Sequence, residues 1–270
     1  MYFQQNFERG FGTFPLKGDK LCRALETALE IGYRAIDTAQ FYDNEQDIAE
    51  TISHCDIPRD ELFLTSKVPV DKFSAKHFRP SVEQSLEKLR VNELDVLLLH
   101  WPPADGHIDT ALELLLEVQQ AGLCRHIGVS NFTAAMLRRC KTLTDSPIVT
   151  NQVEFHPLLN QDALLMASTE TDIPLASYCS VARGKVFDIP LLKKLAADYG
   201  VTIGQIVLRW ILQKGVSVNA MSTNRENIRT NFDVLSFTLS AVDMSRIDAL
   251  THQNYRIVDK ELVPWAPVWD

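Results

Sequence analysis

"GYRAIDTAQFYDNE", residues 32–45, joins an apolar approach to a cluster of polar residues. The approach ends in Asp37, and Tyr42 follows five residues later, directly before "DNE". Such an approach is typical of a buried strand, and the polar cluster is typical of the loop after it. An aspartate at the end of a buried strand is best explained by what the other strand ends carry.

Apolar runs that end in or beside a polar residue recur along the chain and alternate with amphipathic segments. These runs end near Thr13, Asp37, Lys67, His100, Ser130, Gln152, Tyr178 and Met221. Helices are expected over 20–31, 76–89, 109–121, 133–141, 162–171, 189–199 and 226–234, with caps at Ser74, Asp109 and Thr133. Eight strand–helix alternations predict an α/β fold, a closed parallel (β/α)₈ barrel. Residues 202–213 predict one more helix within the last repeat, and residues 240–250 predict a helix outside the barrel.

Length and composition favour one barrel domain over residues 1–270, because barrels of this size routinely form a single unit. A net charge of −8 without a Lys/Arg run argues against a nucleic-acid partner. No apolar run is long enough to span a membrane, and the first residues lack a signal-peptide pattern. Five scattered cysteines without a CxxC motif favour a reduced, cytoplasmic protein. The opening "YFQ" resembles the remnant of a protease site, so the first few residues are expected to be foreign or disordered.

The polar strand ends should meet, because the carboxyl ends of barrel strands converge on one mouth. A free tyrosine has a pKa of about 10 and is a weak acid at neutral pH. A Lys ammonium beside it lowers that pKa, and a buried Asp keeps the Lys charged and oriented. A His at the same point can donate a hydrogen bond to an oxygen that gains negative charge. Asp37, Tyr42, Lys67 and His100 therefore predict proton donation to an oxyanion.

Each of these residues, taken alone, also has an ordinary structural explanation. Asp37 could be a turn cap, Lys67 a surface residue and His100 a hydrogen-bonded structural histidine, while Ser130–Asn131 is a common turn pair. The sequence contains no HExxH or GxSxG motif, so we expect no metal site. "GFGTFP" at residues 10–15 lacks the third glycine of the dinucleotide fingerprint. Another molecule must therefore supply the electrons for any reduction.

Five blocks of the sequence resemble the aldo-keto reductase family, and especially its short bacterial members. They are "GYRAIDTAQFYDNE", "LLLHWP", "GVSNF", "NQVEFHP" and the closing "PWAPVWD", spread over about residues 8–270. The resemblance implies a (β/α)₈ barrel with a C-terminal tail over its mouth, which binds NADP(H). It implies reduction of small carbonyl substrates, such as methylglyoxal or diketogluconate, by a monomer. The implied catalytic residues are Asp37, Tyr42, Lys67 and His100, with Tyr42 as the proton donor.

The resemblance also implies which residues contact the cofactor and the substrate. The nicotinamide carboxamide would be held by Ser130, Asn131 and Gln152, whose side chains can donate and accept hydrogen bonds. Tyr178 would stack on the nicotinamide ring, Thr13 would line the cofactor, and Asp37 would also touch its ribose. The substrate pocket would be walled by Phe14 and Trp101 and closed by Trp265 or Trp269.

The stretch near the expected eighth strand departs from the family pattern. Met221 and Asn227 stand where many members carry a Lys and an Arg, whereas Ser222 and Asn231 match. The two missing basic residues would contact the 2′-phosphate of NADP, so NAD(H) use is also open. Candidate substitutes are Arg225 and Arg229, which could equally belong to a solvated helix face. "YCSVARGK" likewise replaces the usual Ser-Pro-Leu-Gly after the stacking tyrosine.

Two other functions are compatible with parts of the pattern. A Schiff-base aldolase using Lys67 needs a lysine with a lowered pKa, which a neighbouring Asp37 would oppose. A catalytically weak homologue that only binds the cofactor would not need all four catalytic residues.

Overall fold

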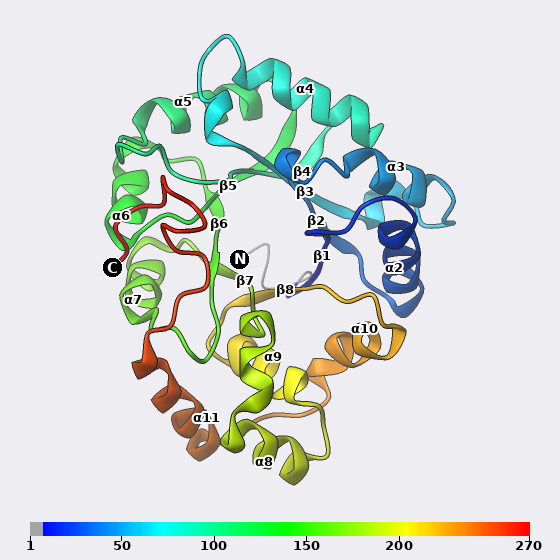
Figure 1. The fold of residues 1–270 in the computed structure, drawn as a ribbon. Coiled ribbons are helices and arrows are strands. Elements are labelled where there is room, and N and C mark those ends of the chain that lie inside the picture. The colour runs from blue at the N-terminus through cyan, green and yellow to red at the C-terminus, as the bar shows by residue number, and fades with distance from the viewer. Residues whose placement is uncertain (1–7) are drawn as a thin grey trace.

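The computed structural model describes residues 8–270, so the expectation for the opening "YFQ" lies outside the described residues. Eight parallel strands close into a barrel in chain order, and β8 pairs with β1. The strands are β1 (Arg9–Gly12), β2 (Ala35–Asp37), β3 (Phe63–Val68), β4 (Leu94–Leu99), β5 (Cys124–Ser130), β6 (Ile148–Glu154), β7 (Leu175–Tyr178) and β8 (Ser217–Ala220). The predicted (β/α)₈ barrel is therefore confirmed, and Figure 1 shows it nearly end-on.

Helices surround the strands as an outer ring (Figure 1). They are α2 (Gly18–Ile31), α3 (Glu45–Ser53), α4 (Phe78–Leu89), α5 (Asp109–Gln120), α6 (Ala134–Leu143), α7 (Asp162–Thr171), α8 (Pro190–Tyr199), α9 (Ile203–Gln213), α10 (Arg225–Phe232) and α11 (Ala241–Asp248). The extra helix of the last repeat is α9, and the helix outside the barrel is α11. A short 3₁₀ helix, η1 (Gln40–Tyr42), follows β2.

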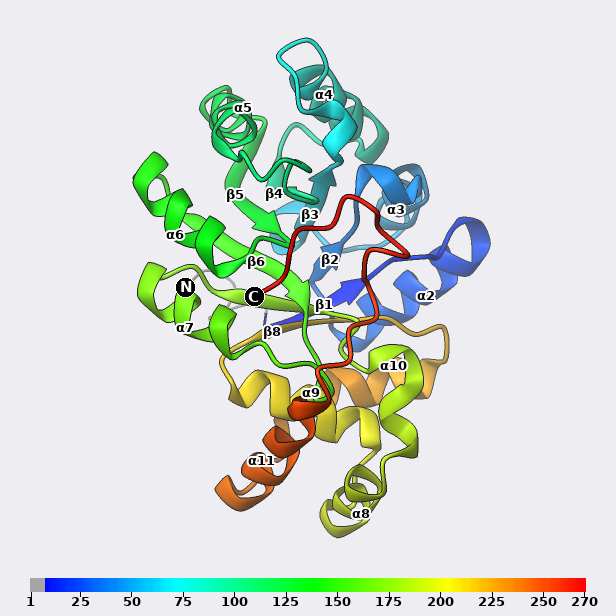
Figure 2. The ribbon, with the colours of Figure 1, turned by 60° about the vertical axis from the view of Figure 1, so that its left-hand side comes forward.

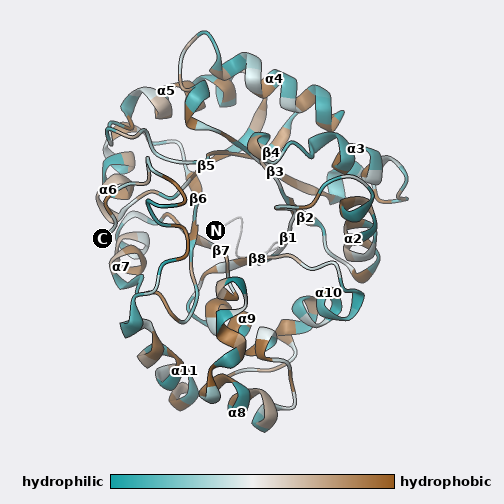
Figure 3. Cartoon of the chain, viewed as in Figure 1, coloured by the Kyte–Doolittle hydropathy of each residue, from teal (hydrophilic) through white to brown (hydrophobic). Residues whose placement is uncertain are grey.

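The core lies between the strands and the helices. Strands β3, β4 and β6 are buried along their whole length, as parallel strands covered on both faces should be. In Figure 3, hydrophobic colour gathers on the strands and on the inner sides of the helices, and hydrophilic colour faces outward. Among the residues that the structure describes, no single helix is long and apolar enough to cross a membrane. The bent pair α8 and α9 meets that test only when the two are taken together.

Three local expectations differ from the structure. The sequence predicts Glu45 in a loop, but it is the first residue of α3. Ser74 does not cap α4, because its hydroxyl bonds to the His77 ring and the helix begins at Phe78. Asp109 lies in the first turn of α5 and not at its cap. Thr133, in contrast, is confirmed as a cap, since its side chain accepts the Met136 N–H.

The segment after α11 returns across the barrel. In Figures 1 and 2 it runs from α11 past the carboxyl ends of several strands before the chain ends beside α6. Trp269, near its end, lies with its ring centroid 6.1 Å from that of Trp101. Asp270 accepts a hydrogen bond from the N–H of Ala134, the first residue of α6, at 2.8 Å. The predicted tail over the mouth is thus held to the loop after β4 and to the start of α6.

Gly128 is a position in the barrel wall where an added methyl group would meet a neighbouring strand's backbone. A Cβ at this point of β5 would lie 2.6 Å from Leu98 Cδ2 and 2.9 Å from the Thr150 carbonyl oxygen. Gly128→Ala should therefore destabilise the protein by about 1–3 kcal/mol through overpacking. Thermal unfolding should show a clear fall in Tm. Gly204→Ala on α9 is the control, because its Cβ meets nothing nearer than 3.5 Å and should leave Tm unchanged or higher.

Candidate active site

The centre of the barrel mouth is a buried ion pair between neighbouring strands. Lys67 on β3 is fully buried, and its Nζ lies 2.6 Å from Oδ1 of Asp37, the last residue of β2. The same ammonium donates to the Thr38 carbonyl oxygen at 2.8 Å and to the Tyr42 hydroxyl at 3.4 Å. These three acceptors match the three N–H donors of a lysine. The pair therefore points a fixed positive charge at Tyr42.

Tyr42 reaches this point because η1 turns the chain back over the end of β2. Since Lys67 donates to the phenolic oxygen, the phenolic proton of Tyr42 remains available for another acceptor. The His100 ring lies edge-on to Tyr42 with 5.6 Å between the ring centroids. Among the described residues, the His100 imidazole has no hydrogen-bond partner. Tyr42 and His100 thus present two free donors side by side.

The pKa values define the charge of each group. Burial raises the pKa of Tyr42, and this effect outweighs the lowering by Lys67, so Tyr42 is a neutral phenol at neutral pH. Burial opposes the charge on Lys67, but the Asp37 carboxylate and Tyr42 outweigh it and raise its pKa. Burial, together with the Lys67 charge, lowers the pKa of His100 to about 3. Sequence reasoning gave the correct sign for Lys67 acting on Tyr42 but missed the larger effect of burial.

Beside the ion pair, amide and hydroxyl side chains line the ends of β5 and β6. Gln152 Nε2 donates to Asp37 Oδ2 at 2.6 Å, which leaves Gln152 Oε1 without a partner among the described residues. Ser130 Oγ donates to the Gln152 carbonyl oxygen at 2.7 Å and accepts from Asn131 Nδ2 at 3.1 Å. Asn131 Oδ1 in turn accepts the Tyr178 hydroxyl at 2.7 Å. One network therefore joins Asp37 to Tyr178.

The backbone of Asn131 makes this network possible. Its φ of +63° is in the left-handed region, which asparagine tolerates better than most residues other than glycine. This turn, directly after β5, keeps the side-chain amide of Asn131 beside Ser130. The Nδ2 atom of Asn131 also donates to the His100 carbonyl oxygen at 3.0 Å. A donor–acceptor set of this kind suits a primary carboxamide, because Gln152 offers a free acceptor and the hydroxyls can both donate and accept.

Asn44 was missed as a site residue by sequence reasoning. It is buried, and its Nδ2 donates to the Thr13 hydroxyl at 3.2 Å and to the Leu16 carbonyl oxygen at 3.0 Å. Its Oδ1 accepts the Thr38 hydroxyl at 2.5 Å. Thr13 also donates through Oγ1 to the Asp37 carbonyl oxygen at 2.9 Å. Asn44 thus connects the loop after β1 to the loop that carries Tyr42. In the sequence, only its position in "YDNE", directly after Tyr42 and Asp43, indicated that it belongs to the site.

The candidate phosphate residues lie in the loop between β8 and α10 and on α10 itself. Ser222 Oγ accepts the N–H of Asn224, whose side chain caps α10 by accepting from Asn227. Arg225, the first residue of α10, is exposed and pairs with Glu30 on α2 at 2.7 Å. Asn231, near the end of α10, faces the first turn of α9, and its Oδ1 lies 3.5 Å from where a Gly204 Cβ would be. Arg229, further along α10, pairs with Glu226 of the same helix at 2.9 Å.

Aromatic side chains border the mouth. The Phe14 ring lies 5.0 Å from Tyr42, and Phe14 is 47% exposed. Phe41, which sequence reasoning did not single out, is 70% exposed and lies 6.5 Å from His100. Trp269 lies beside Trp101, whereas Trp265 is exposed and makes no ring contact among the described residues. Of the two tryptophans considered for closing the pocket, the structure therefore brings Trp269 to it.

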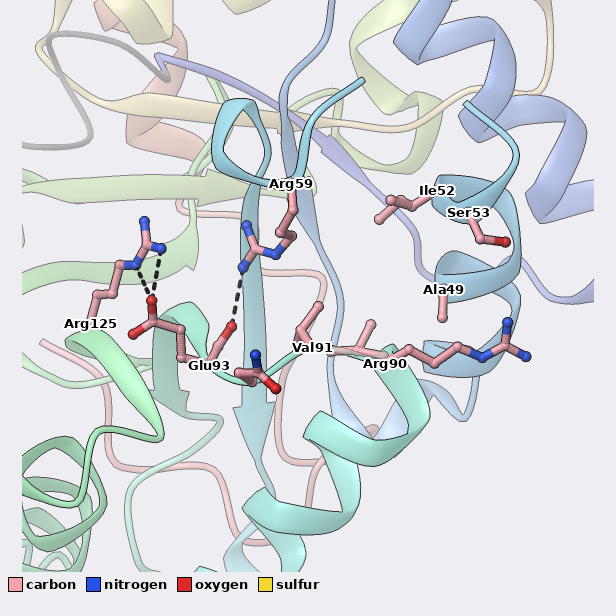
Figure 4. A pocket seen from close by; sticks show the side chains of 10 residues that line it. Ala49, Ile52, Ser53, Arg59, Arg90, Val91, Glu93 and Arg125 are labelled. Atoms are coloured by element: carbon pink, nitrogen blue, oxygen red, sulfur yellow. Dashed lines mark hydrogen bonds and ion pairs between the residues drawn. The ribbon is translucent and has the colours of Figure 1, made fainter. Parts of the chain in front are cut away.

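A hollow of about 360 Å³, drawn in Figure 4, lies near the amino ends of β3, β4 and β5, away from the mouth. It is bounded by the last turns of α3 and α4 and contains Arg59, Glu93 and Arg125. Arg125 pairs with Glu93 at 2.7 Å, and Arg59 pairs with Asp95 at 2.7 Å. These charges neutralise one another at the amino ends of the strands, whereas barrel enzymes place their chemistry at the carboxyl ends. This hollow is not the candidate active site.

Comparison with known proteins agrees with this geometry. The model of the aldo/keto reductase family matches residues 10–252. Methylglyoxal reductase DkgB of Escherichia coli O157:H7 is 37% identical over 264 residues, which cover 97% of this chain and 98% of that protein. An aldo-keto reductase of Mycobacterium avium (strain 104) is 41% identical over 242 residues, covering 89% of this chain and 85% of its own.

Solved structures show the same relationship. A crystal structure provisionally described as 2,5-diketo-D-gluconic acid reductase B superposes with a TM-score of 0.93 at 39% identity, covering all of both chains. The aldo-keto reductase MGS-M4, from a deep-sea metagenome library, gives a TM-score of 0.88 at 30% identity, with 93% of each chain covered. The chain therefore belongs to the aldo/keto reductase family.

Proposed function

We propose that this protein reduces small aldehydes and ketones to alcohols with NADPH, and that Tyr42 supplies the proton. The observation that carries the proposal is the hydrogen bond from Lys67 Nζ to the Tyr42 oxygen, which leaves the phenolic proton free. Relatives named methylglyoxal reductase and 2,5-diketo-D-gluconic acid reductase B support small oxo compounds as the substrate class.

The four central residues would divide the work. The neutral Tyr42 donates its proton to the carbonyl oxygen as negative charge grows there, and Lys67 stabilises the phenolate that results. Neutral His100 donates a hydrogen bond to the same oxygen and orients the substrate. Asp37 keeps Lys67 charged and in place.

NADPH, when bound, supplies the hydride. Its carboxamide would be held by Ser130, Asn131 and Gln152, and its ring would stack on Tyr178. Thr13 and Asp37 would contact the cofactor beside them. Ser222, Arg225 and Asn231 would receive the 2′-phosphate end. Phe14, Trp101 and Trp269 would enclose the substrate, with Trp265 at the outer edge.

The charge on Lys67 disfavours the aldolase alternative. A Schiff base forms on a neutral amine, yet Asp37 and Tyr42 raise the pKa of Lys67 and all three of its donors are engaged. A catalytically inactive cofactor-binding protein would have no need for the free donors of Tyr42 and His100. Turnover of an aldehyde with oxidation of NADPH separates the proposed reductase from both alternatives.

We also propose that the chain acts as one domain and as a cytoplasmic monomer. The closed barrel includes strands from Arg9 to Ala220, and α11 packs outside it, which supports one folding unit. All five cysteines are free, as expected in a reducing compartment.

Tyr42→Phe removes the phenolic proton but keeps the ring. Carbonyl reduction should fall by about 10²–10⁴-fold, the usual contribution of general acid catalysis. NADPH affinity, measured by quenching of tryptophan fluorescence, should stay within twofold of the wild type. A rate within a few-fold of the wild type would show that Tyr42 is not the acid.

Lys67→Met removes the charge that lowers the pKa of Tyr42. The pKa should therefore rise further, and the phenolate that the reverse reaction needs as a base should form only at higher pH. The pH profile of alcohol oxidation should shift toward alkaline values, together with a large loss of rate. A profile that is unchanged, or shifted toward acid, would contradict the proposed role of Lys67.

Arg225→Ala tests the phosphate site. One charge-assisted hydrogen bond is at stake, so NADPH should bind about tenfold more weakly while NADH changes little. Glu30→Gln should act in the opposite direction, because it releases Arg225 and removes a negative charge. Arg229→Ala is the matched control on the same helix and should change neither affinity. Equal weakening of both cofactors by Arg225→Ala would remove Arg225 from the phosphate site.

A further inference from the structure

Glu154 is a buried carboxylate that the proposed chemistry does not use. It is the last residue of β6 and lies on the same side of the strand as Gln152, two residues before it. Its Oε1 lies 2.9 Å from His156 Nε2. His156 Nδ1 accepts the Leu158 N–H at 3.2 Å, so the proton of the neutral ring is on Nε2 and is donated to Glu154.

The other two donors to Glu154 come from more than a hundred residues further along the chain. Oε1 accepts the N–H of Ile257 at 2.7 Å, and Oε2 accepts the N–H of Val258 at 2.8 Å. Both belong to the segment that crosses the barrel mouth, residues 256–270, which we call the mouth strap (Figure 2). Just before it, the N–H of Tyr255 bonds to the Leu158 carbonyl oxygen at 2.7 Å.

The mouth strap is tied at both ends by carboxylates. Glu154 holds its beginning, and its last residue, Asp270, bonds to the first N–H of α6. At the start of the strap, directly before the Glu154 tie, the Arg256 guanidinium lies 3.9 Å from the centre of the Trp269 ring. Trp269 in turn packs against Trp101, the residue after His100. Trp269 thus lies beside Trp101 in a segment that is tied at both ends.

We propose that Glu154 is a positioning residue, which anchors the mouth strap so that Trp269 borders the bound substrate. A carboxylate suits this task because it accepts from several N–H groups at once, and burial strengthens each bond. The substrate part of the inference rests on the proposed function, whereas the anchoring part does not.

Glu154→Gln is the first test. The amide has the same size, but its NH₂ group faces a backbone donor, so at least one bond to the strap is lost. Hydrogen exchange of the Ile257 and Val258 amides should become about ten- to a hundredfold faster, as for the loss of one charge-assisted bond. The KM for an aldehyde substrate should rise about tenfold, kcat should change less, and the NADPH affinity should stay within twofold.

Asp95→Asn is the matched control. Asp95 is equally buried and accepts a backbone N–H, that of Leu64 at 2.8 Å, but it lies near the start of β4 and away from the mouth. It should lower Tm to a similar degree and leave both strap exchange and KM unchanged.

A double-mutant cycle tests whether Glu154 acts through Trp269. Trp269→Ala alone should raise KM, and adding Glu154→Gln should raise it little further, because the two changes remove the same contact. Additive effects on KM would overturn the proposal. If Glu154→Gln does not fold, Asp270→Ala removes the acceptor for the Ala134 N–H, releases the exposed end of the strap and should raise KM in the same way.

The outcomes separate the two proposals. Faster exchange at Ile257 and Val258 in an enzyme that turns over no carbonyl would refute the proposed function and leave the anchor intact. Unchanged exchange in a folded Glu154→Gln variant, or faster exchange with an unchanged KM, would refute the positioning role of Glu154. An Asp270→Ala variant with unchanged KM would also overturn the proposal, because it would show that releasing the strap leaves the substrate site unchanged.

Discussion

The buried pair of Lys67 and Asp37 is the contact on which the rest of the mouth depends. Removing two charges from water is costly, and an ion pair offsets that cost only where further hydrogen bonds satisfy both partners. Here Thr38 and Tyr42 accept the other two hydrogen bonds of the Lys67 ammonium, and Gln152 donates to the second oxygen of Asp37. The pair therefore fixes the loop after β2 and the end of β6 at once. Tyr42 and Gln152, which satisfy the buried charges, are therefore also the residues that provide the proton donor and an amide of the candidate site.

The barrel could be predicted from the sequence because its signal is repeated. Each buried parallel strand appears in the sequence as a short apolar run. Eight such runs with helices between them are compatible with few folds other than the barrel. Local ends were less predictable, because they depend on contacts outside the pattern. Ser74 bonds to His77 before α4 begins, and Glu45 is buried at the start of α3, where it accepts the Ser66 hydroxyl at 2.7 Å. Neither of these polar contacts can be predicted from the spacing of hydrophobic residues in the sequence.

The candidate site was predictable as a set of residue types, but its electrostatics were not. The sequence places a lysine and a tyrosine at neighbouring strand ends, which gives the sign of their interaction. It does not show how deeply the phenol is buried, and burial is the larger influence on the pKa of Tyr42. The Arg225–Glu30 pair shows the same limit, because its residues are far apart in the chain and meet only where α10 packs on α2.

The mouth strap extends this argument to specificity. The family model matches residues 10–252, and the strap follows that match. Chemistry at the ion pair belongs to residues within the matched region, whereas Trp269 comes from the segment beyond it. Glu154 is the point where the two meet, since it lies in the block "NQVEFHP" and binds the backbone of Ile257 and Val258. Because those bonds use N–H groups and not side chains, the residues of the strap can vary without loss of the anchor. A fixed barrel can in this way hold straps of different sequence, and with them different walls for the substrate.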